Sequence, residues 1–289
     1  MTPAEVSAAA QLACLLEVSA PKPGNVSPGL HFHDTRYEDF LASAVAIGPA
    51  MAKAGTRPLG PTIRDAIAAT RRAAGRNTNL GIVLLLAPLC RAALISSDPL
   101  RPAVSAVLAS TSVADAADVY TAIRLAAPSG LGSADAQDIA AAPTVTLREA
   151  MALAADRDSI AREYVTDFAC TFELGAPTLR AARAAGLTWS DAVVETFLAL
   201  LATSPDSQIA RKLGSDAAAD VSRRGAAVWE KGGVRTPGGR AALAALDREL
   251  RDARNQRNPG TSADLAAAAI GVVILEDGWT PSGEHSRAQ

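Results

Sequence analysis

The sequence has few aromatic residues and almost nothing that resembles a β-strand. Only 4% of its 289 residues are aromatic, whereas 49% are hydrophobic, and most of these are alanine and leucine. No run alternates Val, Ile, Thr or aromatic side chains with polar ones between turn residues, which is the pattern of a half-buried strand. No period of 30–50 residues repeats, which argues against a solenoid. The composition therefore favours helices over strands.

Cysteine pairs, long apolar runs and excess charge are also lacking. Cys14, Cys90 and Cys170 form no CxxC pair or Cys/His cluster, so we expect small buried thiols in a reducing compartment. The longest apolar run, residues 80–90, is too short to span a bilayer, and the N-terminus lacks the basic cluster of a signal peptide. The net charge of −2 argues against a general nucleic-acid or anionic-membrane binder. We expect a soluble cytoplasmic protein.

Helix signals recur along the whole chain. Residues 2–5, 35–38 and 146–149 match the capping box, and Gly75 is placed to end a helix. Further helices are expected over residues 61–74, 79–95, 112–127, 158–174, 188–203, 215–229, 239–254 and 262–276. The predicted fold class is all-α: a single globular domain of about ten to twelve helices over residues 1–279. The polar tail, 280–289, is expected to be disordered.

The first of four unusually polar loops runs from residue 19 to residue 35. Pro21 and Pro23 hold Lys22 in a rigid extended segment, and a fixed lysine suits a phosphate. Gly24 permits a sharp turn or close approach to a ligand, next to Asn25. Asp34, just before the next helix, is a candidate metal ligand or proton acceptor. The alternative is a solvated turn followed by a local helix cap.

The second and third loops also begin helices. Asn77, Thr78 and Asn79 precede the most apolar helix, where free backbone N–H groups favour an anion. In the third loop Asp206 is a candidate Mg²⁺ ligand, with Arg211 one turn later. Plain helix caps are the alternative for both loops.

The fourth loop precedes the last apolar helix. Asn258 and Thr261 are candidate anion-binding residues, and Asp264 is a candidate metal ligand or general base, although Thr261 and Asp264 also form a plausible capping pair. Helix starts gathered at one end of a helical domain would make a positively polarised cleft with acidic metal ligands, which suits Mg²⁺-phosphate recognition. We therefore expect Lys22, Asp34, Asn77, Asp206 and Asp264 to line one cleft.

The four loops, taken in order, resemble the triphosphoribosyl-dephospho-CoA synthase family, which makes the prosthetic-group precursor of citrate lyase and malonate decarboxylase. The resemblance rests on residues 21–24, Asp34, residues 77–81, residues 206–207 and residues 260–264. It implies an all-helical enzyme that uses ATP and Mg²⁺. In the implied reaction the 2′-hydroxyl of dephospho-CoA attacks the anomeric carbon of the ATP ribose, and adenine leaves.

Three stretches depart from the family pattern. Residues 31–35 replace a Gly-x-His-x-Asp-Met-like stretch, residues 77–81 lose a basic residue from Asn-Thr-His-Lys-Gly, and residues 206–208 replace Asp-Thr-Asn. The changes resemble relatives associated with tetrahydromethanopterin-linked one-carbon metabolism. They leave the acceptor open between dephospho-CoA and a pterin or another cofactor intermediate.

The predicted function is a pentosyltransferase that moves a triphosphoribosyl group from ATP, or from a related donor, to an acceptor hydroxyl. The predicted catalytic and metal-binding residues are Asp34, Asp206 and Asp264. The predicted nucleotide-binding residues are Lys22, Gly24, Asn25, Asn77, Thr78, Asn79, Arg211, Asn258 and Thr261. The expected partners are small molecules, a nucleotide donor and a phosphorylated or nucleotide-like acceptor, and the apolar helices are compatible with a homodimer. The alternatives are a Mg²⁺-dependent ribosyl or phosphate hydrolase and a helical scaffold without chemistry.

Overall fold

The computed structural model of this chain describes residues 1–130 and 132–279. These residues form fifteen α-helices and no β-strand, which confirms the predicted all-α class. The helices outnumber the expected ten to twelve because some, such as α3 (Gly48–Ala52), are too short to show a periodic pattern. Helix α8 (Leu147–Ala152) is also short, but its capping box announced it. The tail expected to be disordered, 280–289, lies outside the described residues.

The remaining helices have the following bounds: α1 (Pro3–Ser19), α2 (Tyr37–Ala46), α4 (Leu59–Ala74), α5 (Leu80–Ile95), α6 (Leu100–Ala109), α7 (Val113–Ala126), α9 (Ser159–Val165), α10 (Ala176–Ala184), α11 (Trp189–Thr203), α12 (Ser207–Leu213), α13 (Ser215–Glu230), α14 (Pro237–Leu250) and α15 (Gly260–Asp277). Short helical turns lie at η1 (Ala54–Thr56), η2 (Thr171–Gly175) and η3 (Gly233–Arg235).

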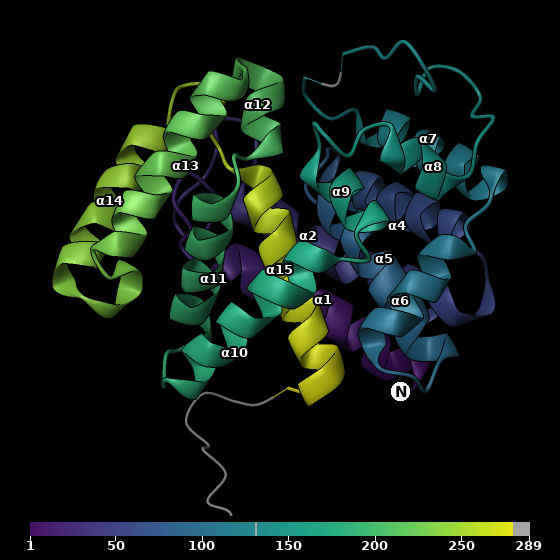
Figure 1. The fold of residues 1–289 in the computed structure, drawn as a ribbon, viewed down its shortest axis with the longest axis horizontal. Coiled ribbons are helices and arrows are strands. Elements are labelled where there is room, and N and C mark those ends of the chain that lie inside the picture. The colour runs from purple at the N-terminus through teal and green to yellow at the C-terminus, as the bar shows by residue number, and fades with distance from the viewer. Residues whose placement is uncertain (131, 280–289) are drawn as a thin grey trace, which may run out of the picture.

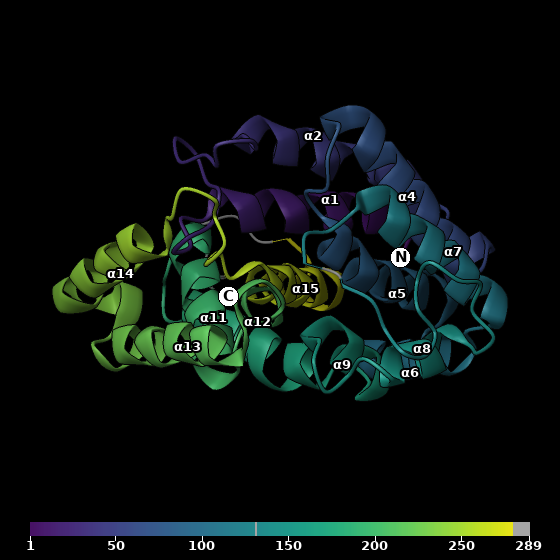
Figure 2. The ribbon, with the colours of Figure 1, turned by 90° about the horizontal axis from the view of Figure 1, so that it is seen from above.

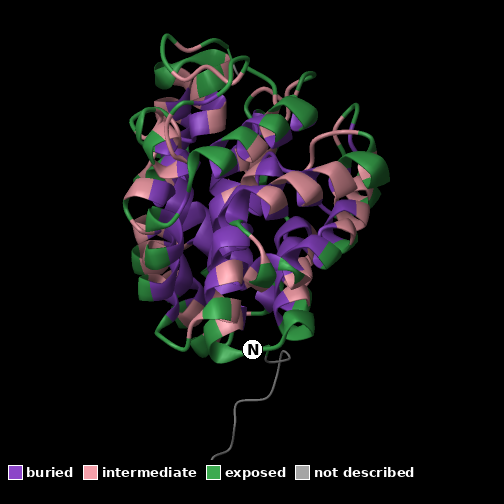
Figure 3. Ribbon diagram, turned by 90° about the vertical axis from the view of Figure 1, so that its right-hand side faces the viewer, coloured by how far each residue is buried: buried purple, intermediate pink, exposed green. Residues whose placement is uncertain are grey.

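Helix α15 forms the centre of the molecule and packs against α1, α5 and α11 (Figures 1 and 2). Most residues of α15 and α5 are buried, and buried side chains from the first helix to the last form one hydrophobic cluster. Figure 3 shows the buried residues gathered in the interior and the exposed ones on the outside. Two of the cysteines, Cys14 and Cys90, are buried as expected, whereas Cys170 is partly exposed. Within the described residues no single helix is long and apolar enough to cross a membrane, and α5 and α6 meet that test only as a pair bent by 108°.

Local capping signals set many helix ends. Thr2 accepts a hydrogen bond from the backbone N–H of Glu5 (3.3 Å) and donates its own N–H to the Glu5 carboxylate (2.7 Å), so the first capping box is confirmed. The box at 146–149 also forms, and Gly75 ends α4 at a φ of 71°. The box expected at 35–38 is wrong by one residue. Thr35 instead closes a turn with the N–H of Phe32 (2.9 Å) and donates its hydroxyl to Asp34 (3.0 Å).

The helix expected over 158–174 is broken. After α9 the chain passes through Asp167 and Phe168, both at positive φ, before the π-helical turn η2. The buried carboxylate of Glu163 causes this break, because it accepts the N–H groups of Cys170 and Thr171 (both 2.9 Å) and so caps a new helical segment. Tertiary burial of one acid here overrides the continuous apolar pattern.

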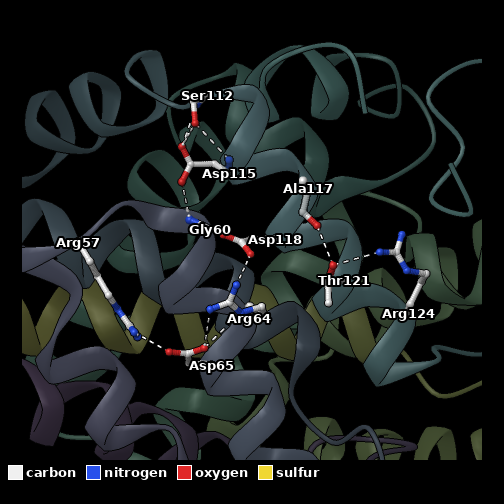
Figure 4. A network of polar contacts seen from close by, with 10 residues as sticks. All are labelled: Arg57, Gly60, Arg64, Asp65, Ser112, Asp115, Ala117, Asp118, Thr121 and Arg124. Carbon is white, nitrogen blue, oxygen red and sulfur yellow. Dashed lines mark hydrogen bonds and ion pairs between the residues drawn. The ribbon is translucent and has the colours of Figure 1, made fainter. Parts of the chain in front are cut away.

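A polar network joins α4 to α7 and stiffens one side of the molecule (Figure 4). The Asp115 carboxylate accepts the N–H of Gly60 at 2.7 Å, and Arg64 reaches Asp118 at 2.5 Å. A Cβ at position 60 would lie 2.6 Å from the Asp115 Cα, so the two helices approach more closely than any larger residue allows. This rigid pair presents α7 to the cavity described next.

Candidate active site

A cavity of about 900 Å³ lies where α5, α12 and α15 begin and α1 ends. This end of the molecule is at the top of Figure 1, where α12 lies beside the start of α15. One wall is apolar and comes from α5, α7 and α8, with Ile82, Val119, Ile123 and Met151 among its side chains. The other wall is polar and comes from the loops before α2, α5 and α15 and from α12. The cavity is therefore large enough and polar enough for a nucleotide, with an apolar surface beside it.

Most of the predicted site residues meet in this cavity. Those that line it are Asn25, Asp34, Asn77, Thr78, Asn79, Arg211, Asn258, Thr261 and Asp264. Lys22, Gly24 and Asp206 are not among the lining residues. Of the five residues expected to share one cleft, Asp34, Asn77 and Asp264 do so, although 230 positions separate the first from the last.

Lys22 is buried and does not reach the cavity, so the expectation that its charge faces a phosphate is wrong. Its side chain has no exposed surface, and its ammonium lies 2.9 Å from the Glu17 carboxylate. It also donates to the backbone carbonyls of Glu17 and Ala20 (3.1 Å to the latter). Three acceptors match the three donors of an ammonium group. Lys22 therefore ends helix α1 and holds Glu17 in place.

Gly24 is a structural residue of the same loop. Its φ is 71°, and its N–H donates to Asp247 of α14 at 2.8 Å. A Cβ at this position would lie 2.8 Å from the Leu250 Cβ. The glycine therefore lets the loop press against α14, which is a close approach to protein and not to a ligand.

Asp206 caps a helix and fastens two helices together. One oxygen accepts the N–H groups of Gln208 (2.9 Å) and Ile209 (3.1 Å), and the other accepts the N–H (2.7 Å) and hydroxyl (2.9 Å) of Ser262. Burial raises the pKa of this carboxyl, and the hydrogen bonds oppose the rise. With four donors already bound, Asp206 has the capping role that was the alternative to a metal ligand.

Asp264 is the predicted acid placed most directly in the cavity. It accepts no hydrogen bond from the described residues, and it packs against the first turn of α5. A Cβ at Gly81 would overlap its Oδ2 and lie 2.5 Å from its Cγ. Burial raises the pKa of the Asp264 carboxyl well above its ordinary value, and the negative charges of Glu17 and Asp206 add to the rise. Asp264 thus keeps free oxygens in a site that favours either a proton or a cation.

An amide network joins three of the predicted loops. The Asn258 amide donates to the Asn25 side-chain oxygen (3.0 Å) and accepts from Gln208 (2.8 Å). Thr261 shares a hydrogen bond with Ser207 at 3.0 Å. These contacts fix the loops before α2, α12 and α15 relative to one another, so the site is held together before any ligand binds.

The residues before α5 are also partly committed to the protein. Asn77 accepts the N–H of Leu80 at 3.1 Å, and Thr78 shares a hydrogen bond with Ser43 at 2.6 Å. Asn79 accepts the Thr70 hydroxyl at 3.0 Å, whereas its buried Nδ2 has no partner. Capping and ligand binding are both compatible with these positions, because each side chain also lines the cavity.

The rim of the cavity is basic, with Asp34 among the cations. Asp34 lies 3.7 Å from Arg76 and 3.9 Å from His33, and about half of its side chain is exposed. Arg211 is paired with Asp158 at 2.9 Å. Further cations on the lining are Arg71, Arg157, Lys212 and Arg254. Burial lowers the pKa of Lys212, a sign that its ammonium is partly withdrawn from water.

The predicted metal centre of three aspartates is not assembled. In residues 1–130 and 132–279 no three His, Cys, Asp or Glu side chains lie close enough to hold a metal ion together. Asp206 is fully hydrogen-bonded, and Asp34 lies at the exposed rim. A Mg²⁺ ion held by fewer carboxylates together with phosphate oxygens remains a prediction.

Comparison with known proteins covers all four of these loops. The profile of the family CitG, described as ATP:dephospho-CoA triphosphoribosyl transferase, matches residues 3–282. The chain belongs to this family. Two curated CitG-family relatives are named probable 2-(5''-triphosphoribosyl)-3'-dephosphocoenzyme-A synthase. The one from Stutzerimonas stutzeri is 32% identical over 36% of this chain and 35% of its own length. The one from Pseudomonas putida is 34% identical over 33% of this chain and 34% of its own length. The chain thus aligns with about a third of each of these relatives.

A solved structure extends the CitG likeness over most of the fold. The putative triphosphoribosyl-dephospho-CoA synthase from Archaeoglobus fulgidus matches with a TM-score of 0.64 and 28% identity. The match covers 83% of this chain and all of the other.

Sequence reasoning missed Glu17 and most of the basic rim of this CitG-family site. Glu17 lines the cavity although it belongs to the last turn of α1. A signal was present, because an acid in an otherwise apolar helix next to a polar loop is unlikely to be buried without a partner. Arg76 was also available, since it directly precedes Asn77 in the second polar loop.

Proposed function

We propose that this chain transfers the triphosphoribosyl group of ATP to a hydroxyl group of dephospho-CoA or of another nucleotide-like acceptor. The observation that carries this proposal is that the four loops on which the resemblance to the family rests line one cavity. It combines a basic rim, a polar floor with free carboxylates and an apolar wall. The family description supports ATP and dephospho-CoA as the two substrates.

The transfer breaks the bond between the anomeric carbon and adenine and forms a bond from that carbon to the acceptor oxygen. Such a displacement passes through an oxocarbenium-like state. The acceptor hydroxyl loses a proton to a carboxylate, and the departing adenine gains one. Asp34 and Asp264 are the predicted acids that reach the cavity and can exchange these protons.

The triphosphate carries about four negative charges and needs cations around it. Arg76, Arg211, Lys212 and Arg254 take the role first expected of Lys22, because all four line the cavity. A bound Mg²⁺ ion would supply further positive charge to the phosphates. The amides of Asn77 and Asn258 supply neutral hydrogen bonds that orient the donor.

The test is incubation of the protein with ATP, Mg²⁺ and dephospho-CoA, followed by chromatography for adenine and mass spectrometry of the product. We expect adenine and a triphosphoribosylated acceptor in equal amounts. Parallel reactions with pterin and ribosyl intermediates identify another acceptor if dephospho-CoA is inactive. Adenine or ADP formed equally well without any acceptor would contradict the transferase and support a hydrolase.

A charge variant tests the phosphate-binding rim. Arg76→Ala should raise the KM for ATP about tenfold or more, with little change in the melting temperature, since the side chain is about half exposed. Arg240→Ala is the matched control, because Arg240 is also exposed and ion-paired but lies on α14, away from the cavity. Equal kinetics for the two variants would contradict the assignment of Arg76.

A further inference from the structure

One oxygen of the Glu17 carboxylate has no partner at the floor of the cavity. Only 4% of the residue is exposed, and its Oε1 is held 2.9 Å from the Lys22 ammonium. Its Oε2 accepts no hydrogen bond from the residues that the structure describes, yet Glu17 lines the cavity. A buried carboxylate normally has its oxygens satisfied. This oxygen is instead open to the cavity, where a cation or a hydrogen-bond donor of a ligand can reach it.

Asp264 supplies a second free carboxylate next to Glu17. Helices α1 and α15, which carry the two acids, pack against one another in the core. Burial raises the pKa of the Cys14 thiol, one turn before Glu17, and the negative charges of Glu17 and Asp264 add to the rise. Gly81 has no side chain and so allows the Asp264 carboxylate to lie against the first turn of α5. Two acids from distant parts of the sequence thus share one partly enclosed floor.

Lys22 orients Glu17 without cancelling the charge of the floor. Its other two donors are bound to the carbonyls of Glu17 and Ala20, so the ammonium is anchored to the end of α1. The three side chains together retain one net negative charge. Hard oxygen ligands with excess negative charge favour Mg²⁺ or Mn²⁺, which proteins often hold through one or two carboxylates together with substrate phosphates.

We propose that Glu17 and Asp264 form a divalent-cation site at the floor of the cavity, with Lys22 as the positioning residue of Glu17. The inference rests on the proposed function in one respect, since the phosphates of the nucleotide donor complete the coordination. It also narrows the roles of the acids: Glu17 and Asp264 hold the cation, Asp34 at the rim receives the proton of the acceptor hydroxyl, and the departing adenine takes its proton from water.

The experiment measures binding of Mn²⁺ alone by the loss of its free electron paramagnetic resonance signal, without nucleotide. The variants are Glu17→Gln and Asp264→Asn. Glu195→Gln is the matched control. The Glu195 side chain is as buried as that of Glu17 (6% exposed in both) and is ion-paired with Arg235 at 2.6 Å. It lies on α11, however, and does not line the cavity. Circular dichroism confirms that each variant is folded at the temperature used.

We expect one Mn²⁺ per wild-type chain, an affinity at least about tenfold lower in Glu17→Gln and Asp264→Asn, and no change in Glu195→Gln. Should Glu17→Gln fail to fold, Asp264→Asn decides the result alone. Wild-type protein that binds no Mn²⁺, or two cavity variants that bind it as well as the control, would overturn the proposal.

The positioning role of Lys22 has its own readout. Lys22→Met should weaken Mn²⁺ binding while the protein is still folded, and Lys22→Arg should restore part of the affinity. Unchanged or higher Mn²⁺ affinity in folded Lys22→Met would show that Lys22 does not position Glu17 for the cation.

Adenine release is measured separately, so the two proposals fail in different ways. If the wild-type protein binds Mn²⁺ as expected but releases no adenine, the result contradicts the transferase and supports the cation site. If the wild-type protein releases adenine but Glu17→Gln and Glu195→Gln bind Mn²⁺ equally well, the result contradicts the cation site and supports the transferase.

Discussion

Removal of the Lys22 ammonium should destabilise the whole protein and not merely weaken nucleotide binding. The side chain has no exposed surface, and its three donors are bound to the Glu17 carboxylate and to the carbonyls of Glu17 and Ala20. Lys22→Met keeps most of the length of the side chain and removes its charge. The variant therefore leaves the Glu17 carboxylate buried and unpaired.

Two independent estimates give the size of the effect. Breaking a buried ion pair by removal of one partner costs about 3–5 kcal/mol. An unpaired carboxylate can escape this penalty by binding a proton, which at pH 7 costs about 3.7 kcal/mol for a glutamic acid with the unperturbed pKa of about 4.3. We therefore expect Lys22→Met to lower the free energy of unfolding by about 3–4 kcal/mol at pH 7.

The assay is urea unfolding of the wild type, Lys22→Met, Glu17→Gln and the double variant, followed by circular dichroism. The double variant carries neither charge, so it should recover much of the stability lost in Lys22→Met. At pH 5 protonation of a free carboxylate is easier by about 2.7 kcal/mol, so the difference between Lys22→Met and wild type should narrow. Wild-type stability in Lys22→Met together with a raised KM for ATP would refute the reasoning, because Lys22 would then face the nucleotide.

Three further outcomes are expected. Asp264→Asn should be more stable than wild type at pH 7 without added cation. Because the pKa of Asp264 is raised in the folded state, the wild-type carboxyl group loses stability as the pH rises above the ordinary carboxyl pKa. The gain in melting temperature of Asp264→Asn over wild type should therefore shrink toward pH 4. An equal advantage at both pH values would contradict the raised pKa. Gly81→Ala should displace the Asp264 carboxylate, lower the free energy of unfolding by about 1–3 kcal/mol and abolish turnover. Gly238→Ala is the control, because Gly238 is also the second residue of its helix but has open space around it, and this variant should be neutral or stabilising. Equal urea midpoints for the two variants would show that the contact between Gly81 and Asp264 is not tight. Asp206→Ala should lower the free energy of unfolding by about 2–4 kcal/mol, because it removes a helix cap and leaves buried donors unsatisfied. A urea unfolding curve that matches the wild type would contradict this structural role.

The helical architecture was predictable because helix signals are local. A capping box acts over four residues, as Thr2 and Glu5 show, and a glycine in the left-handed region ends a helix by itself, as Gly75 does. Prediction of helix bounds from the sequence failed where contacts between distant residues decide the backbone. Glu163 breaks the helix expected over 158–174 because its buried carboxylate binds backbone N–H groups further along the chain.

The sequence by itself also singled out four of the segments that line the cavity, since these polar interruptions stand out from an alanine-rich background, whereas the lining at residues 126–129, 132–134 and 136–139 was not expected. Only the tertiary structure decided which side chain of each loop faces the cavity. Lys22 turns into the protein and leaves Glu17 at the floor, and Asp206 turns toward Ser262, 56 residues away, and leaves Asp264 free. The physical reason is that a charged side chain takes its role from the partners around it, and in this fold those partners come from segments far apart in the sequence.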